Sequence, residues 1–190
     1  MSIVRTVPED EATGVIAEIY RPDVADQGFV ASHTKVMALR PDALQAAQQL
    51  GAAIVAGLGV RRYELATLAA ARALGSEHCL LAHGRKSLGI MSADELAAIA
   101  RDHRAAGLCD ADVELMAFAE KLATDAPSMT DDDSRRLREA GFSDEEIVSV
   151  ALAAGFRCFF SKVLQALAVD VDEVTPGLDP ELRDALVGHL

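Results

Sequence analysis

The chain has 190 residues, of which 51% are apolar and only 4% aromatic, and its formal net charge is −12. The length fits a single domain with a real hydrophobic core. The acidity disfavours nucleic acid and anionic membranes as partners, because both bind to basic patches. The start MSIVRTVPEDEATG is polar, unlike a signal peptide, and no unbroken apolar run reaches the roughly 18 residues of a membrane span. We therefore expect a cytoplasmic protein.

Helix signals fill the first half of the chain. Arg21-Pro22 should end the first helix and leave a loop up to Ser32, while Gly57 and Gly59 should end the second. Gly75 breaks the next apolar stretch, and Ser76 is a suitable N-cap for the helix that follows. The predicted helices cover residues 9–20, 41–56, 61–74 and 77–88.

The second half contains three capping boxes, Ser92 with Glu95, Thr130 with Asp133, and Ser143 with Glu146. Each predicts a helix start. A further helix is expected over residues 111–124, a central buried helix over 144–168, and a short helix from Pro180. Alternating strand patterns are absent. The sequence thus predicts an all-α bundle of about eight helices over residues 1–175, followed by an acidic surface tail, 176–190.

The stretch ELATLAAARALGSEHCLLAH, residues 64–83, carries the candidate chemistry. Cys79 and His83 are four residues apart, so they share one face of a helix. Cys79 also lies near the helix N-terminus, whose partial positive charge favours the thiolate. His83 would accept the thiol proton, with Ser76 and His78 close by.

Glu64 joins this group only if the chain folds back at Gly75. Along one straight helix it would lie about 22 Å from Cys79. In a hairpin closed at Gly75, residue 64 meets the neighbourhood of residues 83–86. The expected order is therefore Glu64, His83, Cys79, with the acid orienting the base and the base activating the thiol.

Structural explanations also exist for each residue. A lone cysteine or histidine on an Ala-rich helix usually belongs to the core, and Glu64 has Arg61 and Arg62 as possible ion-pair partners. Zinc binding by His78, Cys79 and His83 is disfavoured, because adjacent helical residues point about 100° apart and no fourth ligand is evident. We expect no metal ion and no cofactor.

The motif resembles that of the AhpD-like superfamily, which includes the carboxymuconolactone decarboxylases. There, Glu is followed by Cys-x-x-Cys and then by His four residues after the second Cys. Glu64, Ser76-Glu77-His78-Cys79 and His83 fall at those spacings, and His78 matches a histidine often found in that place. The segments AFAEKLATD, LREAGFSDEEI and GFRCFFSK look like the peroxidase-related branch, so the resemblance covers roughly residues 10–173.

The sequence departs from this pattern at Ser76, which stands where disulfide-cycling members have their first cysteine. Serine cannot form that disulfide, so the resemblance implies a one-cysteine hydroperoxide reductase in which an external thiol restores Cys79. Ser76 would still donate a hydrogen bond to the thiolate. We expect Cys158 to fill core beside Phe159 and Phe160, and Cys109 to lie in a loop.

The resemblance also implies homo-oligomers, dimers or trimers of dimers, with sites near subunit boundaries. The expected partners are a small hydroperoxide and an external thiol reductant. Two alternatives stay open at this stage. One is a lactone decarboxylase, in which Glu64 and His83 move protons and the thiol is incidental. The other is a helical oligomer without catalytic activity.

Overall fold

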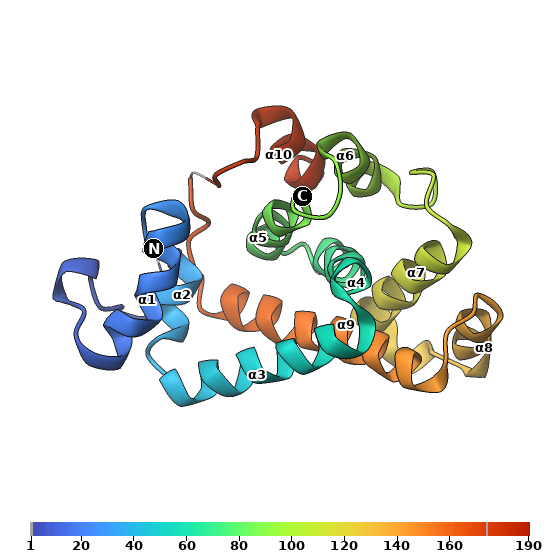
Figure 1. The fold of residues 1–190 in the computed structure, drawn as a ribbon, viewed down its shortest axis with the longest axis horizontal. Coiled ribbons are helices and arrows are strands. Elements are labelled where there is room, and N and C mark those ends of the chain that lie inside the picture. Colours follow the sequence, from blue (N-terminus) through green and yellow to red (C-terminus); the bar gives the residue numbers. More distant parts are fainter. Residues whose placement is uncertain (1, 174) are drawn as a thin grey trace.

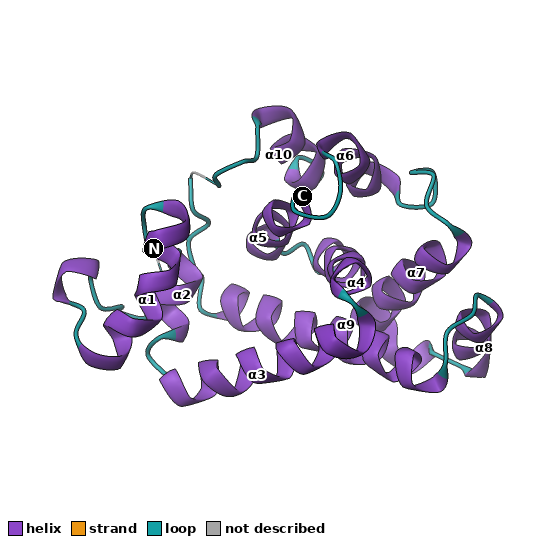
Figure 2. Cartoon of the chain, viewed as in Figure 1, coloured by secondary structure: helices purple, strands orange, loops and turns teal. Residues whose placement is uncertain are grey.

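The computed structural model describes residues 2–173 and 175–190, and within them every regular element is a helix (Figure 2). This confirms the all-α prediction, with somewhat more helices than the eight expected. The α-helices are α1 Gly14–Gln27, α2 Ser32–Met37, α3 Pro41–Leu58, α4 Val60–Ala73, α5 Glu77–Ser87, α6 Ala93–Asp102, α7 Asp110–Asp125, α8 Asp131–Glu139, α9 Asp144–Ala166 and α10 Pro180–Val187. Two short 3-10 helices are η1 Glu9–Glu11 and η2 Ala126–Ser128.

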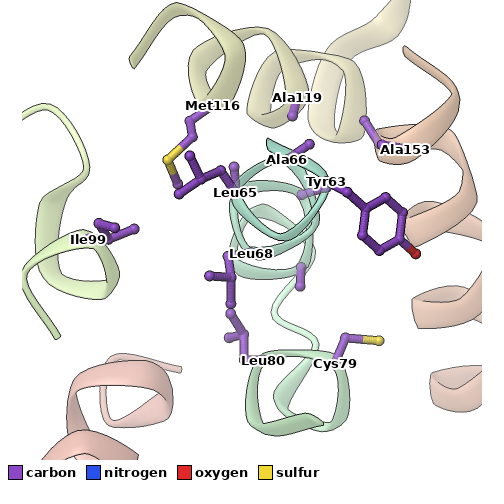
Figure 3. Close-up of a cluster of buried hydrophobic side chains, with 14 of the residues drawn as sticks. Tyr63, Leu65, Ala66, Leu68, Cys79, Leu80, Ile99, Met116, Ala119 and Ala153 are labelled. Atoms are coloured by element: carbon purple, nitrogen blue, oxygen red, sulfur yellow. The ribbon is translucent and has the colours of Figure 1, made fainter. Parts of the chain in front are cut away.

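Helix α4 lies at the centre of the molecule and packs against α3, α5, α7 and α9 (Figure 1). All of its residues from Tyr63 to Ala71 are buried. Many of them are alanines, whose small side chains let neighbouring helices approach closely. Figure 3 shows the resulting core, in which Leu68 of α4 and Leu80 of α5 lie side by side.

The prediction for the first helix was wrong at both ends. The chain forms η1, turns, and then continues as α1 through Pro22 to Gln27. Proline weakens a helix but does not end it when tertiary contacts hold both sides. Here Tyr20, before the proline, is buried and donates a hydrogen bond to the Val7 carbonyl at 2.9 Å. Asp23, after it, accepts one from the Ala31 amide at 3.1 Å.

The capping signals located the later helices well. Thr130 with Asp133 and Ser143 with Glu146 form complete capping boxes at the starts of α8 and α9. Ser92 caps α6 by accepting a hydrogen bond from the Glu95 amide at 3.1 Å. These bonds satisfy amide groups that have no partner inside the helix.

Helix α9 is only partly buried, in contrast to the prediction. Its inner face packs on α3, α4 and α7, but Val148, Leu152 and Phe159 are about half exposed. Among the described residues, α9 is the single helix whose own length and hydropathy would allow it to cross a membrane. It carries Arg157 in its buried face, and a core helix meets the same criteria of length and hydropathy.

The C-terminal tail was expected to lie on the surface, but part of it packs into the core. Helix α10 starts at Pro180 as predicted, but it packs against α5 and α6 and buries Leu182 and Leu186. The Leu186 side chain sits directly over Gly84, where an added Cβ would lie 2.6 Å from a Leu186 methyl carbon. The tail therefore closes one side of the core.

We predict that Leu186→Ala lowers the free energy of unfolding by about 2–5 kcal/mol, because it opens a cavity between α10 and α5. Leu190→Ala, at a position that is 54% exposed, should change it by less than about 0.5 kcal/mol. Urea unfolding of both variants measures the difference. Equal stabilities would mean that α10 contributes nothing to the core.

Candidate active site

The hairpin between α4 and α5 brings the motif residues together. Gly75 adopts a left-handed conformation, with φ of +60°, and the Ser76 amide donates to the Ala71 carbonyl at 2.9 Å. This Schellman turn reverses the chain, as the sequence indicated. Cys79 is the third residue of α5. Figure 3 shows its side chain on the side of α5 that faces α9.

Glu64 and His83 form a buried pair. The Glu64 Oε2 atom lies 2.6 Å from His83 Nδ1, and the two residues are only 5% and 6% exposed. This is the contact that the hairpin argument predicted. The Tyr63 ring packs edge-on against the imidazole, with 6.2 Å between ring centroids.

Arg157 of α9 stands between the imidazole and the thiol. Its Nη2 atom lies 2.7 Å from His83 Nε2, and its Nη1 donates to Cys79 Sγ at 3.2 Å. Arg157 is 4% exposed, and its guanidinium carbon lies 5.7 Å from the centre of the Phe160 ring. The order along the network is therefore Glu64, His83, Arg157, Cys79, with one more member than the sequence indicated.

The guanidinium also fixes the tautomer of His83. Every N–H of arginine is a donor, so His83 Nε2 must accept from Arg157. The proton of the neutral imidazole is then on Nδ1, from which it is donated to the Glu64 carboxylate. His83 is thus held as an acceptor toward Arg157 and does not contact the thiol directly.

Ser161, one helical turn after Arg157, donates a second hydrogen bond to Cys79 Sγ at 3.3 Å. A hydrogen bond of this kind was expected from Ser76. Ser76 is buried at the N-terminus of α5, and its hydroxyl caps no helix amide and makes no hydrogen bond to the sulfur. The serine donor comes from α9 instead.

His78 makes its contacts outside this network. Its Nε2 lies 3.1 Å from the Val169 carbonyl, and its ring is T-shaped to that of His33, 6.1 Å away. It makes no hydrogen bond to Cys79 or His83. The structure therefore groups Glu64, His83 and Cys79, and separates His78 and Ser76 from their network.

A cavity of about 310 Å³ opens in front of the thiol. Its wall includes Cys79, His83 and Arg157, and the remaining lining residues are mostly apolar. These include Met37, Leu44, Tyr63, Phe156, Phe160 and Leu164. The space suits a small, largely apolar molecule that presents one reactive group to the sulfur.

Burial changes the protonation of this site. Removal from water raises the pKa of Glu64 to about 7, while Lys86 and Arg157 lower it in part. Burial, followed by the positive charge of Arg157, lowers the pKa of His83 well below its usual value. Lys86 lines the cavity and is partly exposed to solvent. The burial of its ammonium group among protein atoms lowers the pKa of Lys86.

The other cysteines take no part in this site. Cys109 lies in the loop just before α7, as predicted, and it is exposed. Cys158 is only half-buried, and its neighbour Phe159 is 47% exposed, so the core position predicted for Cys158 was wrong. The buried face of α9 at this level is occupied by Arg157 and Ser161.

Sequence reasoning missed Arg157 and Ser161, although a signal was present. They are four residues apart in an otherwise apolar stretch, so they share one face of the helix. A buried cation needs partners. The sequence does not say which helix supplies them, because the contact spans more than seventy residues.

Known structures share this fold. No protein-family model and no curated protein matches the sequence. An AhpD core protein described as an uncharacterized peroxidase-related protein, from Ralstonia eutropha JMP134, superposes with a TM-score of 0.76 at 20% identity, over 98% of this chain and 96% of that one. An uncharacterized peroxidase-related protein from Silicibacter sp. TM1040 gives 0.72 at 20% identity, covering 92% and 91%.

A third similar structure is a cysteine-to-alanine variant of the debrominase Bmp8 in complex with 2,3,4-tribromopyrrole. Its TM-score is 0.75 at 15% identity, over 100% of this chain and 99% of that one. The chain therefore has the AhpD-like fold, which agrees with the resemblance found in its sequence.

We predict that Glu64 makes folding stability depend on pH. Its pKa is raised from the usual 4.5 to about 7, so the folded state binds this proton more tightly than the unfolded state. The contribution is fully present below pH 4.5 and is lost as pH rises through about 7. It should amount to on the order of 3 kcal/mol.

Urea unfolding between pH 4 and 8 measures this effect as the difference between wild type and Glu64→Gln. The exposed residue Glu18 provides a control, because Glu18→Gln should keep the wild-type profile. Parallel profiles for wild type and Glu64→Gln would show that Glu64 has an ordinary pKa.

Proposed function

We propose that this chain is a thiol-dependent hydroperoxide reductase of the one-cysteine type, with Cys79 as nucleophile. The observation that carries the proposal is the position of the Cys79 sulfur. It accepts hydrogen bonds from Arg157 and Ser161 and lies in the wall of the 310 Å³ cavity. The AhpD-like fold and the two peroxidase-related structures support the same assignment.

The two donors would stabilise negative charge on the Cys79 sulfur when it reacts. A guanidinium that donates to sulfur is a charge-assisted donor, and such bonds are about twice as strong as neutral ones. Arg157 is buried, so water screens its charge little. The thiolate, and not the thiol, is the nucleophile in cysteine chemistry. A cysteine that only filled core would need neither donor.

The proposed reaction balances with an external thiol as reductant. The Cys79 thiolate attacks the distal oxygen of ROOH, the O–O bond breaks, and the alkoxide leaves as ROH after taking one proton. Cys79 is now a sulfenic acid. One external thiol condenses with it to release water and form a mixed disulfide. A second thiol releases the external disulfide and restores Cys79.

Glu64 and His83 act through Arg157 in this scheme. The carboxylate holds the imidazole, and His83 Nε2 accepts from the guanidinium, which is thereby aimed at the sulfur. Both are positioning residues. Lys86 lines the cavity with a lowered pKa, so we assign it the proton for the leaving alkoxide.

The similar structure of the debrominase Bmp8 suggests a second candidate substrate class, brominated pyrroles. It has the same fold and was captured with 2,3,4-tribromopyrrole. The thiolate would attack carbon-bound bromine, so that the C–Br bond breaks, bromine moves to the sulfur and the ring carbon takes a proton. One external thiol would then displace bromide to form a mixed disulfide, and a second would release the external disulfide and restore Cys79. The donors around Cys79 fit either substrate, so both belong in the same assay. The lactone decarboxylase is less favoured, because it leaves Arg157 and Ser161 without a role at the sulfur.

We predict that Cys79→Ser abolishes reduction of cumene hydroperoxide with dithiothreitol as reductant, because no other thiol lines the cavity. Cys109→Ser removes an exposed thiol and should keep full activity. Peroxide consumption is measured directly. Unchanged turnover in Cys79→Ser would reject the proposal.

Further arms of this experiment separate the alternatives. A lactone decarboxylase would lose activity in Glu64→Gln and His83→Gln while Cys79→Ser stayed active on a lactone substrate. A debrominase would release bromide from tribromopyrrole and leave the hydroperoxide intact. Inactivity of the wild type on all three substrates would favour a helical oligomer without catalysis.

We propose also that two copies of the chain pair through the outer face of α9. Val148, Leu152 and Phe159 are between 46% and 58% exposed and follow one stripe of that helix. Leu50 of α3 adds exposed apolar surface, and α3 and α9 pack closely where Gly51 meets Phe156. The family resemblance implies homo-oligomers, and a second copy would bury this stripe.

Leu152→Glu should convert this oligomer to a monomer, because it places a charge in the middle of the stripe. Val15→Glu, on an exposed site of α1 that is 52% accessible, should leave the oligomer intact. Light scattering coupled to size exclusion gives both masses. A monomeric wild type would reject the pairing.

A further inference from the structure

Three potential metal ligands from distant parts of the chain meet beside the thiol cavity. His33 belongs to α2, His78 to α5, and Asp172 to the segment after α9. One ligand atom from each lies within 4.8 Å of the other two. In zinc sites with Zn–N distances of about 2.0–2.1 Å, ligand atoms are separated by roughly 3.3 Å, so small side-chain movements would close this triangle on an ion.

His78 is oriented as a metal-binding histidine usually is. Its Nε2 lies 3.1 Å from the Val169 carbonyl, which can only accept, so the proton is on Nε2. In the neutral ring, Nδ1 is then the nitrogen that can bind a metal ion. Metal-ligating histidines commonly donate their other N–H to a carbonyl in this manner, which fixes the tautomer and the ring.

Asp172 is also held in place by hydrogen bonds, which it accepts from Ser32. Its Oδ1 accepts from the Ser32 hydroxyl at 2.6 Å, and both carboxylate oxygens lie within 3.2 Å of the Ser32 amide. Ser32 is the residue next to His33. One short segment therefore supplies one ligand and orients another, which is more than a chance meeting of surface side chains would produce.

The surroundings leave room for an ion. His33, His78 and Asp172 all line a second cavity of about 160 Å³, to which Asp23 adds another carboxylate. Arg85, also in its wall, is paired with Asp26 at 2.6 Å. Lys86, which lines both this cavity and the thiol cavity, places a second positive charge near the ion.

We propose that His33, His78 and Asp172 bind one divalent first-row transition metal ion. Two imidazoles and one carboxylate suit Zn²⁺ or Fe²⁺ and leave coordination positions open to water or another small ligand. Because His33 and His78 line both cavities, the ion lies in the wall that separates the second cavity from the thiol cavity. It also ties α2 and the segment after α9 to α5. The inference does not depend on the proposed reductase activity.

The test uses the full chain in a Cys109→Ser background, which removes the exposed thiol as a competing zinc ligand. After treatment with EDTA and removal of any affinity tag, calorimetry with ZnCl₂ should show one ion per chain. His33→Ala and Asp172→Asn should each abolish this binding. His189→Ala, an exposed histidine outside the cluster, should bind as the parent does.

A milder variant guards against simple misfolding. Ser32→Ala removes the hydroxyl that orients Asp172, and loss of such a partner typically weakens metal binding about 10–100-fold. Co²⁺ should give d–d absorption bands in the parent that His33→Ala lacks, with circular dichroism confirming that each variant is folded. Absence of stoichiometric Zn²⁺ binding by the parent, or equal binding by His33→Ala, would overturn the proposal.

Discussion

The arrangement of the site depends on the hydrogen bonds that the buried guanidinium of Arg157 makes to His83 and Cys79. A cation among apolar helices needs acceptors, because an unpaired buried charge is very costly. It has them in His83 Nε2 and Cys79 Sγ, on a helix distant in sequence. Its Nε has no hydrogen-bond partner among the described residues. The position of α9 against α5 is therefore specified by polar contacts as well as by packing.

This constraint explains why the acid and the imidazole are buried together. Arg157 makes His83 an acceptor at Nε2, and the proton on Nδ1 then requires an acceptor of its own. Glu64 supplies it from α4 at 2.6 Å. Burial opposes ionisation of that carboxyl and raises its pKa to about 7, so the carboxylate form of Glu64 predominates only above neutral pH.

The Ala-rich helices make such a network possible because their small side chains allow neighbouring helices to pack closely. Small side chains on α4 bring α5 and α9 close enough for three helices to share one hydrogen-bonded chain. The same packing leaves a cavity before the sulfur, and His33 and His78 form part of the wall between it and a second cavity. Cys79 lines only the first of these cavities, whereas His33 and His78 line both. The hydrogen bond of His78 goes to Val169 and not to the network of Cys79.

The sequence by itself determined the all-helical class, the Gly75 hairpin and the meeting of Glu64 with His83, because spacing and capping act over a few turns of one chain segment. It misplaced the first helix, since only distant contacts carry α1 through Pro22. Tertiary structure alone decided that Arg157 separates the imidazole from the sulfur, that Ser161 replaces Ser76 as donor, and that His33 and Asp172 join His78. Those contacts depend on how helices remote in sequence pack, and local patterns do not encode that geometry.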